Sequence, residues 1–223
     1  MASKREINSQ YDLIAEDYVN NQRGFFTGKD DWTRSKLKQE LKKYKGKKIL
    51  DIGCGAGDDI KWCEENGIEA YGVEYSEKML NLAKNNVAYP ENVKIGDYES
   101  IPFDDNYFDL VMGRFSLHYL KNFELAYKEI GRVLKSGGQL LIVASNPTYD
   151  TLKLQETDGD GLISVNLYGG RVVVKFPPHT LTDYFSREFF RQFVLQEIIE
   201  SESVDAENPL KIPETLYFKA VKL

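Results

Sequence analysis

A glycine-rich turn directly after an apolar run has the clearest chemical content in this chain. Ile49, Leu50 and Ile52 form the apolar run, and glycines stand at positions 53, 55 and 57. Glycine tolerates left-handed backbone and has no side chain, so such a turn lets the backbone lie against a ligand. Asp58 and Asp59 follow at the predicted start of a helix, where the helix dipole favours carboxylates. The segment predicts a nucleotide-like ligand at the carboxyl end of a parallel strand.

The charge of this turn favours one kind of nucleotide ligand over another. A dinucleotide fingerprint, G-x-G-x-x-G, would place a third glycine where this chain has Asp58. A carboxylate there would repel a pyrophosphate, which binds at the positive end of a helix. S-adenosylmethionine combines adenosine, an amino acid and a sulfonium cation without any phosphate, and therefore fits better. Asp51 and the loop backbone at Gly53, Cys54 and Gly55 are candidates to bind its ammonium group.

Two further acidic residues follow the next two predicted strands. Glu74 stands about twenty residues downstream of the turn, the position of a ribose-binding carboxylate, and its two oxygens can accept from two hydroxyls. The residues expected around the adenosine are Tyr75 on the adenine face, Met79 in the first turn of a helix capped by Ser76, and Gly96, Asp97 and Tyr98 after the third strand. Asp97 is expected to accept from the adenine amino group. Taken singly, each acid could be an ordinary polar residue at a strand end; together they predict a cofactor site.

Five blocks in a fixed order make the chain resemble the class I S-adenosylmethionine-dependent methyltransferases, most of all their small-molecule branch. The blocks are residues 50–57, 72–80, 96–97, 102–111 and 132–142, and the resemblance covers roughly residues 10–145. It implies an α/β fold with a doubly wound Rossmann-like sheet of about seven strands, mostly parallel with an antiparallel C-terminal edge. It also implies S-adenosyl-L-methionine as cofactor, S-adenosyl-L-homocysteine as product, and methyl transfer to an oxygen, nitrogen or carbon atom of a small molecule.

The resemblance also assigns roles to residues outside the strand ends. In this family an N-terminal segment folds over the cofactor, and Tyr11, Tyr18 and Arg23 occupy that segment here. An arginine there suits the methionine carboxylate, because a planar guanidinium donates two parallel hydrogen bonds. Arg114, followed by Phe115 at the carboxyl edge beside the cofactor, competes for the same role.

His118 is the candidate catalytic residue. Methyl transfer from a sulfonium is an in-line displacement of an activated leaving group, so alignment does most of the work and lowers the barrier by roughly 7–11 kcal/mol. A general base adds roughly 10²–10⁴-fold where the acceptor must lose a proton. His118 follows predicted strand 108–112, and histidine titrates in the useful range. The alternative is that His118 packs on the following helix and bonds a backbone carbonyl.

Hydrophobic periodicity predicts a regular alternation of strands and helices in the middle of the chain. We expect strands at 48–52, 69–73, 92–95, 108–112 and 138–144, and helices at 58–66, 76–86 and 122–134. This alternation indicates a parallel sheet with helices on both faces. Residues 7–22 and 32–45 predict two helices before the first strand.

The pattern changes after residue 146. Two β runs, 162–167 and 171–176, flank Tyr168-Gly169-Gly170 and predict a hairpin where many relatives carry a helical insert. A helix at about 181–191 and strands at 193–199 and 215–221 follow. We interpret residues 1–223 as one domain, with a helical cap (1–45), a cofactor-binding core (46–146), a lid or acceptor insert (147–192) and closing strands (193–223).

Composition excludes several classes of protein and partner. The 223 residues carry a formal net charge of −6, which argues against a general nucleic-acid surface. Two cysteines and two histidines without metal-ligand spacing predict no metal site and suit a reducing compartment. There is no apolar N-terminal run and no apolar stretch long enough to span a bilayer, so we expect a cytoplasmic protein that does not bind membranes. We expect it to be a monomer or a weak homodimer.

Other functions remain open at this point. An RNA or protein methyltransferase is less favoured, because Gly113-Arg114-Phe115-Ser116 stands where amino-methylating nucleic-acid enzymes usually carry an Asp/Asn-Pro-Pro-aromatic run. A catalytically silent S-adenosylmethionine-binding protein on the same fold is a further alternative. A nicotinamide-dependent dehydrogenase is disfavoured by Asp58 in place of the third glycine.

Overall fold

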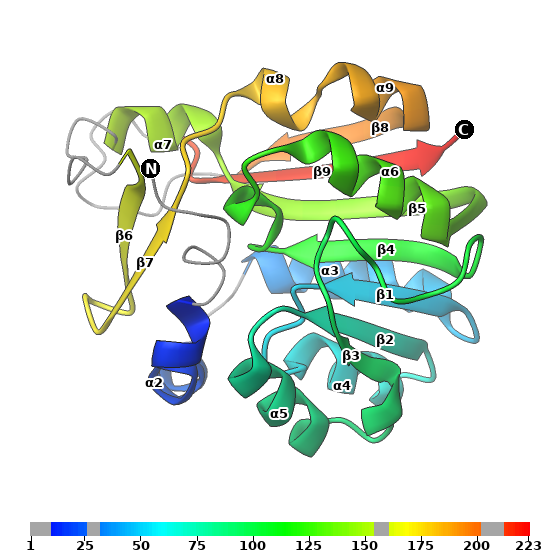
Figure 1. Cartoon of the computed structure of the whole chain (residues 1–223), viewed down its shortest axis with the longest axis horizontal. Coiled ribbons are helices and arrows are strands. Elements are labelled where there is room, and N and C mark those ends of the chain that lie inside the picture. Colours follow the sequence, from blue (N-terminus) through cyan, green and yellow to red (C-terminus); the bar gives the residue numbers. More distant parts are fainter. Residues whose placement is uncertain (1–9, 26–31, 154–160, 202–211) are drawn as a thin grey trace.

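A seven-stranded sheet forms the centre of the molecule (Figure 1). The computed structural model describes residues 10–25, 32–153, 161–201 and 212–223. The strand order is β3-β2-β1-β4-β5-β9-β8. These strands are β1 (Lys48–Ile52), β2 (Glu69–Glu74), β3 (Val93–Ile95), β4 (Phe108–Arg114), β5 (Leu134–Ser145), β8 (Phe193–Glu200) and β9 (Thr215–Lys222).

Strand direction divides the sheet into a parallel part and an antiparallel edge. β1 lies between β2 and β4 and is parallel to both, with Asp51 opposite Gly72 on one side and Met112 on the other. β9 runs antiparallel to β5 and to β8, so the last two strands close the sheet in the opposite direction. This topology confirms the predicted mostly parallel sheet with an antiparallel C-terminal edge. The order of β1 to β5 changes direction at β1, where open α/β sheets bind ligands.

Helices cover both faces of the sheet (Figure 1). One core packs α3 (Trp32–Leu41), α4 (Asp58–Glu65) and α5 (Glu77–Asn86) against residues such as Ile49 and Leu110. The other packs α6 (Phe123–Val133), α8 (Leu181–Tyr184) and α9 (Arg187–Gln192) against Leu50 and Val111. Adjacent residues on one strand thus enter opposite cores, which explains the nearly continuous apolar runs of the central strands.

Several boundaries differ from the predicted ones. The helix expected over 32–45 ends at Leu41 and continues as a 3₁₀ turn, η1 (Lys42–Tyr44), before Gly46. The single helix expected over 181–191 is broken into α8 and α9, because the Ser186 side chain accepts from Phe189 N–H at 3.3 Å and starts a new helix. β4 extends to Arg114 and β5 begins already at Leu134, directly after α6. The remaining short elements are η2 (Pro90–Asn92), η3 (Leu117–Tyr119) and α7 (Pro147–Lys153).

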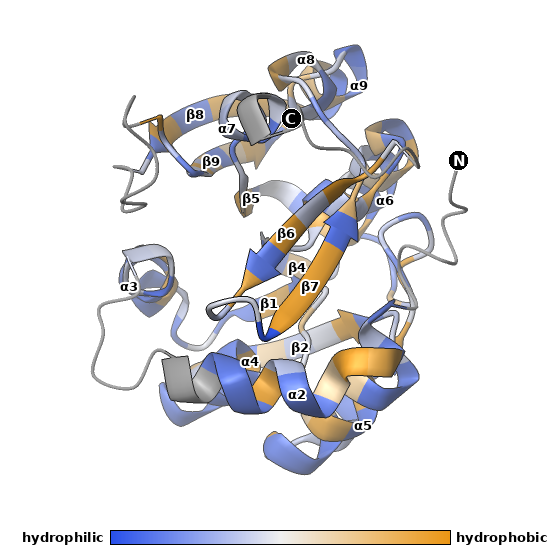
Figure 2. Ribbon diagram, turned by 90° about the vertical axis from the view of Figure 1, so that its left-hand side faces the viewer, coloured by the Kyte–Doolittle hydropathy of each residue, from blue (hydrophilic) through white to orange (hydrophobic). Residues whose placement is uncertain are grey.

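The predicted hairpin is present as a separate two-stranded sheet. β6 (Ile163–Leu167) pairs antiparallel with β7 (Val172–Phe176), and we refer to this pair as the hairpin. Together with α2 (Gln10–Phe25), it lies beyond the ends toward which β1 and β4 point (Figure 1). Viewed from that side, the hairpin crosses in front of the strand ends, with α2 and α5 beside it (Figure 2). In the part of the chain that the structure describes, no helix is long and apolar enough to cross a membrane.

Candidate cofactor-binding site

The glycine turn, residues 53–57, forms at the carboxyl end of β1. Gly53 has a φ of +72°, and a β-carbon at this position would lie 2.4 Å from the β-carbon of Ser116. The N–H groups of Gly53 and Cys54 both donate to the Val73 carbonyl of β2, at 2.7 and 3.1 Å. Positive φ and the close approach of the loop after β4 together require glycine here. The turn is therefore held from both neighbouring strands.

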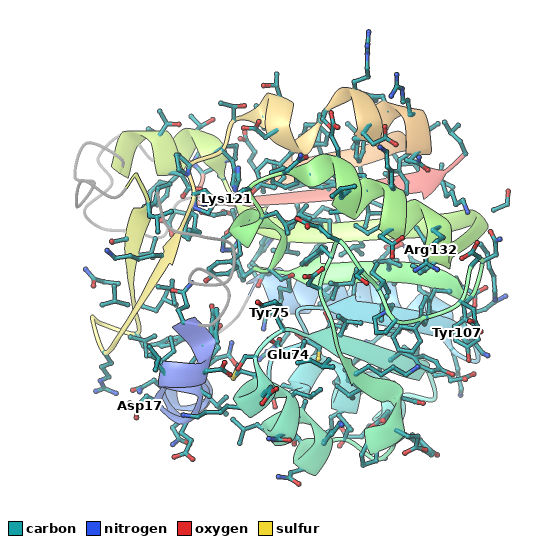
Figure 3. The ribbon with its side chains drawn as sticks, in the orientation of Figure 1. Asp17, Glu74, Tyr75, Tyr107, Lys121 and Arg132 are labelled. Atoms are coloured by element: carbon teal, nitrogen blue, oxygen red, sulfur yellow. The ribbon has the colours of Figure 1, made fainter. Side chains whose placement is uncertain are left out.

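Glu74 ends β2 and lies against the glycine turn. Its Oε2 accepts from Gly55 N–H at 2.9 Å, and its Oε1 accepts from Ser76 N–H at 2.9 Å. Burial raises the pKa of Glu74, and these backbone hydrogen bonds oppose that rise. Figure 3 places Glu74 and Tyr75 at the end of β2, on the side where α2 lies. A carboxylate has about four acceptor positions, so the side chain that braces the turn can still accept from ligand hydroxyls.

A cavity of about 970 Å³, including its open mouth, lies at this edge of the sheet. This size is at the upper end of the range for small-molecule and cofactor sites. The predicted site residues that line it are Tyr11, Tyr18, Asp51, Gly53, Cys54, Gly55, Glu74, Tyr75, Met79, Gly96, Asp97, Tyr98, Arg114 and Phe115. The fold thus brings residues from four strand ends and from α2 to one hollow. The side chain of Arg23 lies outside the described residues.

Asp97 and Tyr98 close the cavity beyond β3. Asp97 Oδ1 accepts from the backbone N–H groups two and three residues further on, at 2.7 and 3.1 Å, which fixes the carboxylate at the rim. The Tyr98 hydroxyl donates to the Ile52 carbonyl at 3.0 Å and is also hydrogen-bonded to Ser116 Oγ. Ser116 Oγ also lies 2.8 Å from the Ile52 carbonyl oxygen, so with Tyr98 donating there, the Ser116 hydroxyl donates to Tyr98. These bonds tie the loops after β1, β3 and β4 together beneath the cavity.

One wall of the cavity carries a group of paired charged side chains that was not predicted from the sequence. Asp59 accepts from Arg34 Nε and from Arg114 Nε, each at 3.0 Å, and all three side chains line the cavity. Burial alone would raise the pKa of Asp59, but the two guanidinium groups outweigh it and hold the pKa below its usual value. Arg34 comes from α3, far from the motifs, so spacing gave no signal for it. Two guanidinium groups and one carboxylate give this group of three side chains a net positive charge.

Asp51 contributes a buried carboxyl group to the floor of the cavity. Its side chain is 4% exposed. Burial raises the pKa of Asp51 well above its ordinary value, and the negative charge of Asp59 adds to the rise while Arg114 opposes it. A charged carboxyl group in such a place lowers stability at neutral pH, which makes Asp51 a candidate for binding the cationic part of a ligand.

We expect Asp51→Asn to stabilise the free protein by about 0.5–2 kcal/mol near pH 7. The folded-state pKa of Asp51 lies above its unfolded value, so the native carboxylate costs stability as pH rises from the unfolded pKa through the folded one. The gain in the variant should therefore shrink as the pH falls toward about 4. Urea unfolding at pH 4 and pH 7 checks both signs. A variant that is less stable than the native protein at pH 7 would contradict this interpretation.

α2 covers the cavity with aromatic side chains. Tyr11, Tyr18 and Gln22 reach the cavity from α2, and Tyr119 reaches it from η3. The hydroxyls of Tyr11 and Tyr119 are hydrogen-bonded at 2.7 Å, and the ring of Tyr18 contacts that of Tyr11 edge-on at 5.1 Å. Gln22 and Tyr119 were missed in the sequence, although both lie within four residues of predicted site residues.

His118 lies outside the set of described residues that line the cavity. Its ring is 4% exposed and packs against Tyr119 and Phe176, with centroids 4.5 and 4.6 Å apart. Burial, with a smaller contribution from the neighbouring His179, lowers the pKa of His118 to about 3. His118 is therefore buried, but its ring packs against Tyr119 and the hairpin rather than on the following helix as the alternative expects, and its own carbonyl oxygen lies 2.8 Å from His179 Nε2. Geometry gives the general-base role no support, and that role stays an untested prediction.

Neither cysteine thiol is activated as a nucleophile or as a metal ligand. Burial raises the pKa of Cys54 well above its usual value and also raises that of Cys63, so both thiols are protonated at neutral pH. A protonated thiol is a poor nucleophile and a poor metal ligand. Among the described residues, no group of three or more His, Cys, Asp or Glu side chains is arranged to hold a metal ion.

Comparison with known sequences identifies relatives for most of the central region. The family model described as a methyltransferase domain matches residues 50–142. A demethylmenaquinone methyltransferase from Staphylococcus aureus strain MRSA252 is 36% identical over 160 residues, and the match covers 68% of this chain and 66% of that relative. The chain thus matches slightly less than two thirds of the length of that relative. The region matched by the family model contains the glycine turn, Glu74 and Asp97.

Solved structures share the fold at lower identity. A protein from Listeria monocytogenes, described as an S-adenosylmethionine-dependent methyltransferase, is 24% identical with a TM-score of 0.66, over 83% of this chain and 97% of that one. The [4+2]-cyclase SpnF is 17% identical with a TM-score of 0.67, over 99% and 97%. At these identities the likeness concerns the fold, and the cyclase shows that the fold hosts more than one reaction. The domain match, the curated relative and the geometry of the strand ends agree that this chain belongs to the class I S-adenosylmethionine-dependent methyltransferases, whose cofactor is S-adenosylmethionine.

Proposed function

We propose that this protein transfers the methyl group of S-adenosylmethionine to an atom of a small-molecule acceptor. The observation that carries the proposal is that one cavity joins the glycine turn to Glu74 and Asp97, acids that follow two neighbouring strands. A phosphate-free adenosyl compound matches this combination of donors and acceptors. The cavity is large enough for the cofactor and part of an acceptor together.

Each part of the cofactor has a candidate partner in the cavity. Glu74 would accept from the ribose hydroxyls, and Asp97 from the adenine amino group. Asp51 would balance the ammonium group, which explains why a buried acid is kept there. The methionine carboxylate would lie near the Arg34–Asp59–Arg114 group, because those three side chains together carry a net positive charge. These roles follow from the position and charge of each side chain.

A hydroxylated aromatic ring is the acceptor that we propose first. The S. aureus relative is named for demethylmenaquinone, a quinone, which makes this class a natural starting point. The cavity wall formed by Tyr11, Tyr18 and Tyr119 supports it, since aromatic side chains pack edge-on against a planar ring and phenolic hydroxyls bond its oxygens. In the proposed reaction, an acceptor atom would form a bond to the methyl carbon as the carbon–sulfur bond breaks. S-adenosylhomocysteine would leave, and the proton released from the acceptor would pass to solvent.

The test measures product formation on a panel of acceptors. The protein is incubated with S-adenosylmethionine and reduced naphthoquinols, phenols or small amines, and S-adenosylhomocysteine and methylated products are followed by mass spectrometry. Turnover on a small molecule supports the proposal, whereas turnover on RNA or protein alone would replace it. Binding without turnover on any acceptor would favour a silent cofactor-binding protein. Absence of S-adenosylhomocysteine binding at millimolar concentration would remove the proposal.

A further inference from the structure

The hairpin is attached to α2 by the side chain of Gln10. Gln10 Nε2 donates to the Lys175 carbonyl and Gln10 Oε1 accepts from Lys175 N–H, both at 2.8 Å. A carboxamide thus pairs with β7 as a neighbouring strand would, on the edge that β6 leaves open. Tyr18 and Tyr168 add a ring contact at 5.7 Å. A two-stranded hairpin is barely stable alone, so these contacts help to fix its position.

α2 is also attached, through Asp12, to the side of the molecule that carries the candidate cofactor site. Asp12 Oδ1 accepts from Ser76 Oγ at 2.6 Å and from Lys78 N–H at 3.3 Å. Ser76 is the N-cap of α5, and its own N–H donates to Glu74, the candidate ribose ligand, at 2.9 Å. Ala15 and Val19 of α2 pack beside these bonds on Met79, which lines the cavity. α2 therefore contacts the cofactor side through Asp12 and the hairpin through Gln10. Figure 2 shows α2 beside both α5 and the hairpin.

We propose that Asp12 and Gln10 are positioning residues that transmit cofactor occupancy to the hairpin. The inference rests on the proposed function, because it takes Glu74 and Met79 as cofactor contacts. A bound adenosyl group restrains Glu74, Ser76 and Met79, and these restrain α2 through Asp12. Gln10 then holds β7 in place, so the cofactor orders the wall beside which the acceptor enters. Cofactor binding should therefore precede productive acceptor binding.

The residues that line the cavity allow this coupling to be distinguished from a direct contact between a bound ligand and the hairpin. Among the described residues, those that line the cavity come from α2, α3, η3, the strand ends with their following loops, and the first turns of α4 and α5, and none comes from β6 or β7. A ligand in the cavity that slows amide exchange in the hairpin must act through an intermediate element. The base of the hairpin is attached independently, because Phe176 packs on His118 with centroids 4.6 Å apart. Loss of Gln10 should therefore loosen the hairpin without detaching it.

The experiment is hydrogen exchange of residues 163–167 with and without saturating S-adenosylhomocysteine, on the full chain. In the native protein the ligand should slow exchange in this strand. Gln10→Ala and Asp12→Ala, which cut the two ends of the connection, should each reduce the slowing while still binding the ligand at saturation, and the ring contact of Tyr18 with Tyr168 accounts for any slowing that remains. Because coupling is reciprocal, calorimetry should show the affinity of both variants for S-adenosylhomocysteine falling by roughly 5-fold or more. Asn20→Ala, at an exposed position of α2, is the matched control and should behave as the native protein does.

Two results would overturn the inference while leaving the proposed function in place. One is ligand-dependent slowing in Gln10→Ala equal to that in the native protein. The other is binding of S-adenosylhomocysteine to the native protein with no change in the hairpin. If the native protein does not bind the ligand at all, the proposed function fails and the inference with it. Thermal melts of each variant establish that the compared proteins are folded.

Discussion

Replacing Glu74 with glutamine should weaken S-adenosylhomocysteine binding by roughly 100-fold, or about 2.7 kcal/mol. The native carboxylate already accepts from Gly55 N–H and Ser76 N–H at 2.9 Å each, and we propose that its remaining acceptor positions serve the ribose. An amide nitrogen cannot accept, so the variant loses a ligand contact and also turns a donor toward the glycine turn or the ribose. Titration calorimetry with S-adenosylhomocysteine measures the loss directly.

Glu77→Gln is the control for this substitution. Glu77 lies three residues further on, in the first turn of α5, and is exposed. Its replacement by glutamine changes the net charge by the same amount as Glu74→Gln does. Its affinity should stay within about twofold of the native value, because no ligand contact is removed. Similar affinities for the Glu74 and Glu77 variants would show that the acid at the end of β2 does not bind the cofactor.

Gly53→Ala should lower the free energy of unfolding by about 3 kcal/mol and abolish cofactor binding. Part of this loss is the left-handed backbone, with φ at +72°, which costs a residue with a β-carbon about 1–2 kcal/mol. The rest is steric, because the new β-carbon would lie 2.4 Å from the Ser116 β-carbon, and overpacking costs about 1–3 kcal/mol. Relief of the contact would push the loops after β1 and β4 apart, at the floor of the cavity.

Gly137→Ala separates the two contributions to this loss. Gly137 also has a φ of +72°, but a β-carbon there would meet nothing within 4 Å. The Gly137 variant should therefore lose about 1–2 kcal/mol in urea unfolding and retain its affinity for S-adenosylhomocysteine. Equal stability losses at the two positions would mean that the Ser116 contact relaxes without cost and that Gly53 is needed for its backbone conformation alone.

The central sheet and most of the cavity lining could be predicted because their signals are local. The central parallel strands are buried on both faces and read as apolar runs, and the acidic site residues lie at or just beyond the carboxyl ends of the strands. The strands that carry Asp51, Glu74 and Asp97 are neighbours in the sheet, and the carboxyl ends of parallel strands meet at one edge. The three acids therefore lie around the same cavity. The predicted helix over 181–191 failed for a local reason too, since Ser186 begins a new helix within it.

Contacts between distant segments could not be read from the chain. Arg34 joins Arg114 on Asp59 through packing of α3 beside the sheet, and no spacing relates these three positions. His118 has the right residue type at the right strand end, yet η3 turns its ring toward Phe176 of the hairpin rather than into the cavity. The direction of a side chain on a short turn depends on what packs against it, and here that is a segment more than fifty residues away.

The sequence by itself determined the parallel sheet, the glycine turn and the acids at the strand ends, because burial and backbone conformation constrain each of these within a few residues. Tertiary structure alone decided how α2 and the hairpin cover the cavity. Their attachments, Gln10 to Lys175 and Asp12 to Ser76, each depend on one or two hydrogen bonds between segments 165 and 64 residues apart. Such bonds form only after the sheet has brought both partners to the same edge.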